Sequence, residues 1–334
     1  MKKQSLIIGC CLLVISLVFF VFHFYFNLKN IPTSPLKAEK IDFEISPGMS
    51  FNEIAEKLKN ESLIQSETVF KIYGALSMKA RQLKPGRYVL VPNLSVSELV
   101  AILIKGPKEI PVIIAPGLTL KEIDDKLSEV RIIKSGELIN FEISASEKDY
   151  PFLAEADSLE GFLFPDTYNF FLGSGADLVI HRFLDNFKNK ALSLFESSDK
   201  LLDKLILASI LEKEIPDYEE KKIVAGILLK RLKTGMPLQV DASVVYAKCF
   251  GRFLNCGQIS KADYKINSVY NTYFYSGLPK GPIANPGLES IRAILNSKKT
   301  EYWYYLSDPK TKKTIFSKTL DEHNKNRVIY LLNR

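Results

Sequence analysis

The sequence predicts an α+β protein with an N-terminal transmembrane helix, a small α+β region and a larger mixed α+β domain that encloses a buried helix. Three observations support this fold class. Residues 6–26 are apolar, a strand–turn–helix pattern recurs three times between residues 41 and 130, and the helix expected near residue 205 has no polar face. A length of 334 residues leaves room for two or three domains.

The net charge is mildly positive, with 45 Lys and Arg against 38 Asp and Glu, a formal balance of +7. This charge suits an anionic partner, but it does not choose between nucleic acid, an acidic membrane and an acidic cell-wall polymer. No dense block of lysine and arginine is interleaved with aromatic residues. We therefore expect no nucleic-acid partner.

Residues 6–26 contain no formally charged side chain and are numerous enough to cross a bilayer as a helix. Two lysines precede the run, so the positive-inside rule places residues 1–5 in the cytoplasm. A cleaved signal peptide is the alternative, but no small-x-small cleavage site follows and the run exceeds a usual signal core. We expect a single membrane span at 6–26, a stalk at 27–40, and the rest of the chain outside the cytoplasm.

Three segments between residues 41 and 130 fit one template. Each has a turn, then Ser or Thr with Glu three residues later, then apolar residues spaced as on a helix; the segments are 47–58, 92–103 and 116–127. The Ser/Thr–Glu pair is the signature of a capping box that opens a short helix. Plausible strands precede the segments, at 41–45, 87–91 and 110–114. Such units resemble LysM-type glycan-binding modules, so we expect a LysM-like region over 41–130; generic α+β packing is the alternative.

From residue 150 onward the pattern changes to longer helices joined by loops with many aromatic residues. Helices are expected at 176–190, 200–215, 219–234, 241–249 and 288–297, and a strand pair at 301–306 and 313–317. The loops are expected at 160–173, 235–240 and 269–287, and they are rich in Tyr, Asn, Pro and Gly. Loops of this composition beside a buried helix are typical of a sugar-binding cleft, because sugar faces stack on aromatic rings. Loops are also where functional residues concentrate.

The helix near residue 205 supplies the first candidate catalytic group. The apolar residues between Leu201 and Leu211 occupy every side of this helix, which indicates that it is buried. Pro216 disfavours helix at the residue before it, so Glu214 should lie in the last turn. The C-terminal end of a helix dipole and burial both disfavour a carboxylate, and both raise its pKa. A carboxyl group partly protonated near neutral pH can serve as a general acid; the alternative is a charged helix end exposed to solvent.

Other common catalytic chemistries find no support. The sequence has no G-x-S-x-G motif and no phosphate-binding glycine loop. None of the three histidines has a ligand partner at metal spacing, so we expect no metal and no cofactor. Carboxylates remain as the acid–base groups. Glu212 and Glu214 point roughly 200° apart on a helix and are not a pair.

Further polar residues lie in the expected loops. Glu160, Asp166 and Asp241 stand beside turn sequences and are candidate partner carboxylates, or else helix caps and turn residues. Residues 270–273 place four hydrogen-bonding side chains in a row, which suits hydroxyl and acetamido groups; an Asn-centred turn is the alternative. Cys249 and Cys256 either close a local disulfide in an oxidising compartment or remain two free thiols.

Several motifs together resemble one family. They are Glu160-Gly161-Phe162-Leu163-Phe164-Pro165-Asp166-Thr167-Tyr168, Ala208-Ser209-Ile210-Leu211-Glu212-Lys213-Glu214, Arg231-Leu232 with Gly235-Met236-Pro237-Leu238-Gln239 and Asp241, Tyr270-Asn271-Thr272-Tyr273, Gly277-Leu278-Pro279, Pro282-Ile283-Ala284-Asn285-Pro286-Gly287, and Glu322-His323-Asn324. In this order they resemble the membrane-bound endolytic murein transglycosylases of the YceG-like family, over essentially the whole chain. One departure is that Ala242-Ser243 stand where the family commonly has Pro-Thr.

The resemblance implies a lyase of the inner membrane that cuts the β-1,4 bond between N-acetylmuramic acid and N-acetylglucosamine within nascent strands. It implies 1,6-anhydro ends, a role in ending strand elongation beside the cell-wall synthases, and a catalytic domain over residues 150–334. Glu214 corresponds to the family's catalytic glutamate. The expected substrate-binding residues are Glu160, Asp166, Tyr168, Gln239, Asp241, Asn271, Thr272, Tyr273 and Asn285. The alternatives are a wall-binding scaffold without catalysis and, less favoured, a hydrolase.

Overall fold

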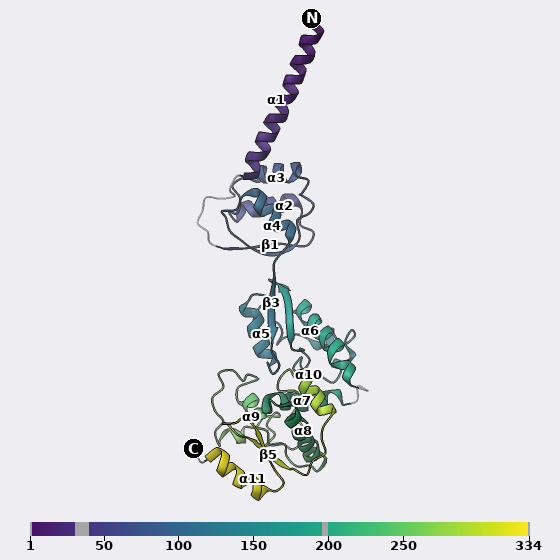
Figure 1. The fold of residues 1–334 in the computed structure, drawn as a ribbon, viewed down its shortest axis with the longest axis vertical. Coiled ribbons are helices and arrows are strands. Elements are labelled where there is room, and N and C mark those ends of the chain that lie inside the picture. Colours follow the sequence, from purple (N-terminus) through teal and green to yellow (C-terminus); the bar gives the residue numbers. More distant parts are fainter. Residues whose placement is uncertain (1, 31–39, 196–199, 333–334) are drawn as a thin grey trace. The chain divides into compact units, whose positions relative to one another are not determined.

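The computed structural model of the chain describes residues 2–30, 40–195 and 200–332. They form two compact units. Unit 1 comprises Met1–Ile110 with Phe171–Gly173, and unit 2 comprises Pro111–Phe170 with Ser174–Arg334. The described residues contain helices and two-stranded sheets in both parts of the chain, so the expected α+β class is confirmed (Figure 1).

Helix α1 (Lys2–Asn30) includes the apolar run at 6–26, and side chains such as Leu13 and Phe19 are exposed on it. Over the part of the chain that the structure describes, no helix is both long and apolar enough to cross a membrane. The membrane span expected at 6–26 is therefore not confirmed. Of the expected stalk, residues 27–30 continue α1, and residues 31–39 lie outside the described residues.

Unit 1 packs helices on a short antiparallel sheet. Its elements are β1 (Ile41–Ile45), α2 (Phe51–Asn60), α3 (Glu67–Leu76), β2 (Gly86–Leu90) and α4 (Val96–Lys105). Strand β1 pairs with β2, with Phe43 opposite Tyr88. All five elements contribute to one apolar core, in which Phe43, Phe70 and Leu103 are fully buried. Helix α3, which the sequence pattern did not predict, contributes Phe70 and Tyr73 to this core.

The three expected capping boxes are all present. They open α2, α4 and α5 (Leu120–Glu129), with Ser50–Glu53, Ser95–Glu98 and Thr119–Glu122 as the reciprocally bonded pairs. In the third box the backbone N–H of Thr119 donates to Glu122 Oε2 at 3.0 Å, and the N–H of Glu122 donates to the Thr119 hydroxyl at 3.2 Å. Helix α5 belongs to unit 2, so the boundary between the compact units falls inside the 41–130 region. The glycan-binding role of that region stays a prediction.

Strand β3 (Glu109–Ile114) pairs with β4 (Asp166–Phe171), and the loop expected over 160–173 was wrong in this stretch. Burial along β4 alternates: Tyr168 and Phe170 are buried while Thr167 and Asn169 are exposed. That is the period of two of a half-buried strand. The segment is short, and its partner strand lies about 50 residues earlier in the chain. Local composition therefore did not reveal the pairing.

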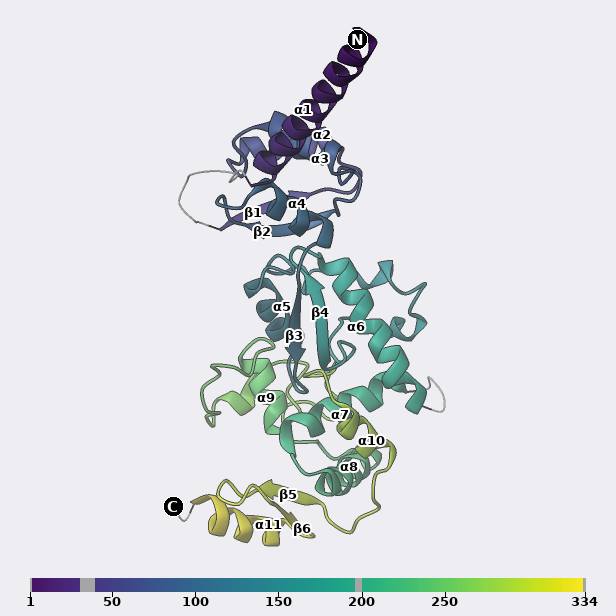
Figure 2. The same cartoon turned by 45° about the horizontal axis from the view of Figure 1, so that its top comes forward.

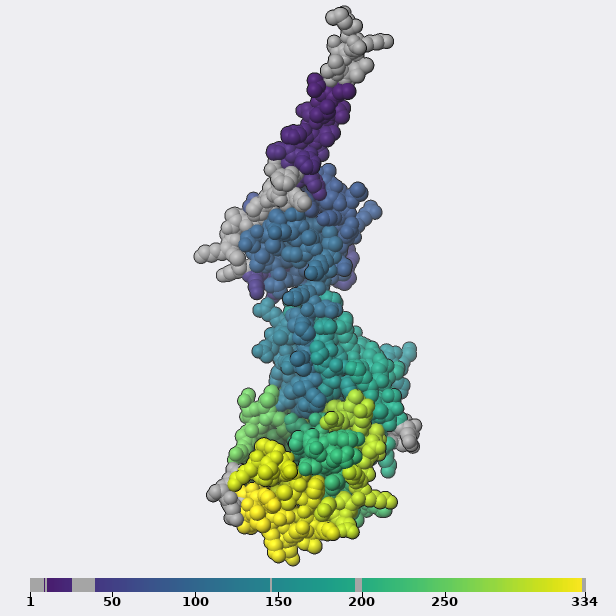
Figure 3. Space-filling view, viewed as in Figure 1, coloured from purple at the N-terminus to yellow at the C-terminus, as the bar shows by residue number. Residues whose placement is uncertain are grey.

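The larger helices of unit 2 begin and end within two residues of the expected positions. They are α6 (Ala176–Lys190), α7 (Leu201–Glu214), α8 (Tyr218–Lys233), α9 (Asp241–Lys248) and α10 (Leu288–Leu295). The antiparallel pair β5 (Tyr304–Ser307) and β6 (Thr314–Ser317) and helix α11 (Leu320–Arg327) follow. Figure 3 shows these C-terminal residues, in yellow, as a continuous part of the surface of unit 2. Single turns of 3-10 helix at Ile143–Ala145, Pro151–Leu153, Leu192–Leu194 and Asp263–Lys265, and a π-helix at Val328–Leu332, complete the described elements.

Helix α7 is the buried helix that the sequence predicted. Every residue from Leu205 to Leu211 is buried. The helix contacts α8, α9 and α10, and Figure 2 shows α9 on one side of α7 and α8 and α10 on the other. Because neighbours surround α7, an apolar sequence without a polar face is stable there. This packing fixes the position of the helix end that carries Glu214.

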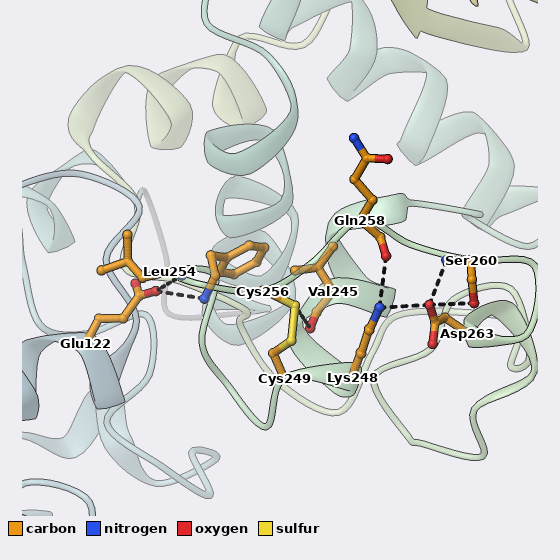
Figure 4. The surroundings of a disulfide bond; sticks show 10 residues. Glu122, Val245, Lys248, Cys249, Leu254, Cys256, Gln258, Ser260 and Asp263 are labelled. Carbon is orange, nitrogen blue, oxygen red and sulfur yellow. Dashed lines mark hydrogen bonds and ion pairs between the residues drawn. A yellow bond between two sulfur atoms is a disulfide. The ribbon is translucent and has the colours of Figure 1, made fainter.

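A disulfide joins Cys249 to Cys256 and decides between the two alternatives left open for these residues (Figure 4). The loop that it closes is held to α5. Glu122 Oε1 accepts hydrogen bonds from the backbone N–H groups of Phe253 and Leu254, at 2.7 and 2.9 Å. Two further contacts with α5 are the pair Arg252–Asp125, at 3.0 Å, and the bond from Lys121 to the carbonyl of Phe250.

Candidate active site

A polar cavity of about 560 Å³ lies in unit 2 at the C-terminal end of α7. We call it the Glu214 cavity. Its lining comes from α7, α8, the start of α9, the 264–273 loop, β5 and the C-terminal helices. The lining residues are Glu214, Arg231, Gln239, Asp241, Tyr264, Tyr273, Tyr304, Tyr305, Leu306, Ser307, Leu320, His323, Asn324, Arg327 and Leu331.

Glu214 is the last residue of α7, as expected from the proline two positions later. Ile215 follows it in an extended conformation, with φ −128° and ψ 121°. This is the backbone region that a residue before proline favours. The side chain of Glu214 is partly covered and lines the cavity. The alternative of a charged helix end in open solvent is therefore wrong.

The environment of Glu214 favours a protonated carboxyl group. Burial raises the pKa of Glu214 to about 7, and the nearby charge of Asp241 also raises it. The backbone N–H of Ala242 donates to Glu214 Oε1 at 3.0 Å and acts in the opposite direction. Near neutral pH the group is consequently present in both protonation states. Since Oε1 accepts the bond from Ala242, the proton of the acid form belongs on Oε2.

Asp241 and two tyrosines form a hydrogen-bonded group beside Glu214. The hydroxyl of Tyr273 donates to Asp241 Oδ1 at 2.7 Å, and the hydroxyl of Tyr264 donates to the same oxygen at 3.2 Å. Burial, and then the charge of Asp241, raises the pKa of both phenols. Both hydroxyls therefore stay protonated and act as donors. The two rings, whose centroids are 4.5 Å apart, add aromatic surface to the cavity.

Glu212 faces away from the cavity. Its Oε2 accepts hydrogen bonds from the backbone N–H of Gly287, at 2.9 Å, and from the hydroxyl of Ser290, at 2.8 Å. Its Oε1 lies 3.7 Å from Nζ of Lys221. These contacts hold the start of α10 against α7. The expected divergence of the two glutamates along α7 is confirmed, and only Glu214 reaches the cavity.

Three of the nine expected substrate-binding residues line the cavity: Gln239, Asp241 and Tyr273. Asn271 and Thr272 are buried beside it and hold its walls. The amide nitrogen of Asn271 donates to the carbonyls of Tyr264 and Ile266, at 3.1 and 2.9 Å. The hydroxyl of Thr272 accepts from the backbone N–H of Val240 at 2.9 Å and therefore joins the 270s loop to the start of α9.

Glu160 and Asn285 belong to a buried polar network outside the cavity lining. Glu160 is 2% exposed, and its carboxyl group accepts from the backbone N–H of Leu120 and the hydroxyl of Tyr246. Asn285 donates to Glu160 Oε1 at 2.9 Å and accepts from the backbone N–H groups of Gly161 and Leu163. Burial raises the pKa of Glu160 to about 8. The network ties together the 160s loop, α5, α9 and the 283–287 segment.

Asp166 and Tyr168 lie on β4 and contact α6. Asp166 pairs with Lys190 and accepts from the amide of Asn186 at 2.7 Å. Tyr168 donates to the carbonyl of Phe164 at 2.6 Å and accepts from Asn186 at 2.9 Å. Neither side chain lines the Glu214 cavity.

The structure also brings into the cavity residues that the sequence did not nominate for the site. Arg231, Tyr304 and His323 come from α8, β5 and α11, which are far apart in the sequence. The ring of Tyr304 stacks on that of His323, with centroids 5.2 Å apart, and the guanidinium carbon of Arg231 lies 5.2 Å from the Tyr304 ring centroid. The sequence feature that could have pointed to this part of the site is the aromatic run at 302–305, which is followed by a polar helix.

The arrangement supplies acid–base chemistry in an aromatic, hydrogen-bonding cavity. Across the described ranges, no group of three His, Cys, Asp or Glu side chains is placed to hold a metal ion. Glu214 can give and take a proton near neutral pH. The phenols and the basic side chains can donate hydrogen bonds to a polar ligand.

Comparisons with a family profile, with curated proteins and with solved structures all point to the same family. The sequence profile of the YceG-like family matches residues 43–328. The endolytic murein transglycosylase of Bacillus subtilis is 30% identical over 319 residues, covering 87% of this chain and 85% of that protein. The endolytic murein transglycosylase of Streptococcus pneumoniae strain R6 is 29% identical and is spanned by this chain over 57% of its length. A crystal structure of a YceG-like protein from Listeria monocytogenes, 30% identical, matches 87% of this chain and all of that chain with a TM-score of 0.56.

Proposed function

The chain belongs to the YceG-like family, and we propose that it is an endolytic murein transglycosylase whose catalytic residue is Glu214. The enzyme cleaves the β-1,4 bond between N-acetylmuramic acid and N-acetylglucosamine inside glycan strands and leaves 1,6-anhydro-muramyl ends. The observation that carries the residue assignment is the carboxyl group of Glu214. It has a pKa raised to about 7 and opens into a polar cavity with four tyrosines in its lining.

The reaction needs one acid that later acts as a base. The proton on Glu214 Oε2 passes to the glycosidic oxygen as the bond from that oxygen to C1 of the muramyl residue breaks. The C6 hydroxyl of the same residue forms a bond to C1, and the Glu214 carboxylate takes its proton. The acid is therefore restored within one cycle and no water is consumed. Because the nucleophile is part of the substrate, the second carboxylate of ordinary glycosidases is not required.

The expected binding residues divide into two roles in this proposal. Gln239, Asp241 and Tyr273 contact the sugars, since they line the cavity. Asn271 and Thr272 position the loop that carries Tyr273 and the start of α9. The remaining four, Glu160, Asp166, Tyr168 and Asn285, position the surrounding segments through their hydrogen bonds.

We also propose that residues 6–26 anchor the enzyme in the inner membrane, with residues 1–5 in the cytoplasm and the catalytic domain outside it. The uncharged run and the exposed apolar side chains along α1 support this anchor. The LysM-like 41–130 region would bind nascent strands, and neighbouring synthases would supply them. Replacing two central apolar residues, Val14→Asp with Phe19→Asp, should release the protein from membranes during fractionation. If both forms sediment equally with membranes, the anchor lies elsewhere.

The enzymatic proposal is tested by incubating the purified full-length chain with glycan strands and analysing the products by mass spectrometry. We expect new ends that are one water lighter than reducing ends. The Glu214→Gln variant should bind strands without cutting them. Glu289→Gln, which changes an exposed carboxylate on α10, should cut normally. Reducing ends would identify a hydrolase. Strands left intact by the unmodified chain would favour a binding scaffold.

A further inference from the structure

We propose that three basic residues of the Glu214 cavity, Arg231, His323 and Arg327, form a subsite for a carboxylate carried by the glycan strand. We call these three residues the basic wall. The proposal rests on the proposed function for the identity of the ligand. Its physical basis is a set of cationic and hydrogen-bonding groups that open into the cavity and lack an acidic partner within the described chain.

Arg231 is the deepest member of the basic wall and is only 4% exposed. Its Nε donates to the carbonyl of Trp303 at 2.9 Å, and its Nη1 donates to the carbonyl of Leu238 at 2.7 Å. Among the described residues, no ion pair joins this guanidinium to a carboxylate, and Nη2 makes no hydrogen bond. Buried charges are normally paired. A guanidinium with free donors next to a cavity is therefore suited to an anionic ligand.

His323 adds a second unpartnered group. Its Nδ1 is buried and has no hydrogen-bond partner among the described residues. Burial lowers the pKa of His323, and the positive charges of Arg327 and Arg231 lower it further, so the three side chains share one electrostatic environment. A buried polar nitrogen without a partner costs free energy.

Arg327 is exposed at the end of α11 and lines the cavity. Over the described ranges it forms no ion pair. Two other exposed arginines do pair with carboxylates: Arg252 with Asp125 at 3.0 Å and Arg87 with Glu44 at 3.1 Å. Figure 2 shows α11 beside β5 and β6, and β5 also contributes residues to the cavity lining. The carboxyl groups of the lining are Glu214 and Asp241, and Asp241 is already bonded to two phenols.

A carboxylate is the anion that best fits this wall and this substrate. The planar guanidinium matches carboxylate geometry and donates two parallel hydrogen bonds to it. Muramic acid carries a lactyl ether whose carboxyl group is free in peptide-free strands. In complete strands that group is joined to a peptide stem, which has carboxylates of its own. The lactyl group and the peptide stem both offer a carboxylate. Binding measured with peptide-free strands and with peptide-carrying strands distinguishes the two.

The test measures equilibrium binding with the full-length Glu214→Gln variant, which is expected to bind strands without cutting them. Two strands are compared, one free of peptides and one carrying them, each with its carboxylates either free or converted to methylamides. We expect the methylamide form of at least one strand to bind about tenfold more weakly. A loss confined to the peptide-free strand assigns the lactyl group, and a loss confined to the other strand assigns the stem.

In the Glu214→Gln protein, the further change Arg327→Gln should weaken binding of the free-carboxylate strand until it equals that of the methylamide strand. Binding of the methylamide strand should stay the same. Arg292→Gln, an exposed arginine on α10 outside the cavity, is the matched control and should change neither. His323→Gln provides a second probe of the wall. The proposal is overturned if methylamides bind as tightly as free carboxylates in both strands, or if Arg327→Gln weakens both forms equally. Absence of cleavage by the unmodified chain would instead refute the enzymatic function, because these binding comparisons need no catalysis.

Discussion

Glu214 Oε1 accepts a hydrogen bond of 3.0 Å from the backbone N–H of Ala242, so the C-terminal end of α7 meets the N-terminal end of α9 at the candidate acid. The two helix ends act in opposite directions on the carboxyl group. Burial and the C-terminal end of α7 favour the neutral form, whereas the N–H of Ala242 at the start of α9 favours the anion. The resulting pKa of about 7 suits a group that must first give and then take a proton.

Cleavage should decline as pH rises through about 7. The reaction starts from the protonated form of Glu214, and the pKa of that group is raised from its usual 4.5 to about 7. The acid form therefore predominates below pH 7 and falls about tenfold for each pH unit well above it. Initial rates measured at saturating strand concentration from pH 5 to 9 would check this. A rate that stays constant up to pH 9 would show that Glu214 is not the acid.

The stability of Glu214→Gln relative to the unmodified chain should increase with pH. Because the folded-state pKa lies above the unfolded value, the folded protein retains a proton between pH 4.5 and 7, and its stability falls as pH rises through that window. Glutamine has no such titration. We expect the difference in unfolding free energy to grow by roughly 3 kcal/mol between pH 4 and 8, as an upper estimate. Denaturant unfolding at both pH values measures it, and an unchanged difference would mean that the carboxyl group titrates normally.

Ala242→Pro should shift the pH dependence of cleavage upward. Proline has no backbone N–H and is tolerated in the first turn of a helix, so the change removes the donor to Glu214 while retaining α9. Loss of that donor destabilises the carboxylate and raises its pKa further. The control is Ala242→Ser, which keeps the N–H and should leave the pH profile unchanged. If the proline variant folds and has the profile of the unmodified chain, the Ala242 bond does not tune the acid.

Glu160→Gln should destabilise unit 2 although the two side chains have nearly the same shape. The carboxyl group accepts bonds from Leu120, Tyr246 and Asn285. A glutamine amide would direct N–H groups toward these donors and leave some of them unpaired, at a cost of about 2–4 kcal/mol. Thermal unfolding near pH 4.5 measures the effect, because the raised pKa of Glu160 increasingly favours the glutamine variant at higher pH. Glu155→Gln, an exposed change in the same segment, should unfold like the unmodified chain. Equal midpoints for both variants would contradict a supporting role for Glu160.

Replacing both Cys249 and Cys256 by serine should loosen the loop between them without stopping cleavage. The disulfide closes a short loop, with a sequence separation of 7, for which the expected contribution is about 2 kcal/mol at most. The contacts with Glu122 and Asp125 remain, and the loop does not line the Glu214 cavity. Hydrogen exchange should become faster within 249–256 while the rate of cleavage stays the same. Loss of cleavage in a folded variant would instead link this loop to the site.

Local signals predicted much of the fold and part of the site. The three capping boxes and the boundaries of α6, α7 and α10 follow from residues adjacent in the sequence. Strand β4 and helix α3 were missed, because their burial depends on partners distant in the chain. The same limit applies to Arg231, Tyr304 and His323. Nothing near any of them in the sequence shows that the other two will be its neighbours.

The sequence by itself determined that an apolar helix ends at Glu214, since a run of buried side chains and a following proline act within one turn of the backbone. It also determined that Glu212 and Glu214 diverge, because helix geometry separates positions two residues apart. Only the tertiary structure decided which of the two reaches a cavity, which oxygen of that carboxyl group is held by Ala242, and which basic groups share the cavity with it. Those outcomes depend on how distant helices pack, and burial and hydrogen bonding, which set the pKa of a carboxyl group, exist only once that packing is complete.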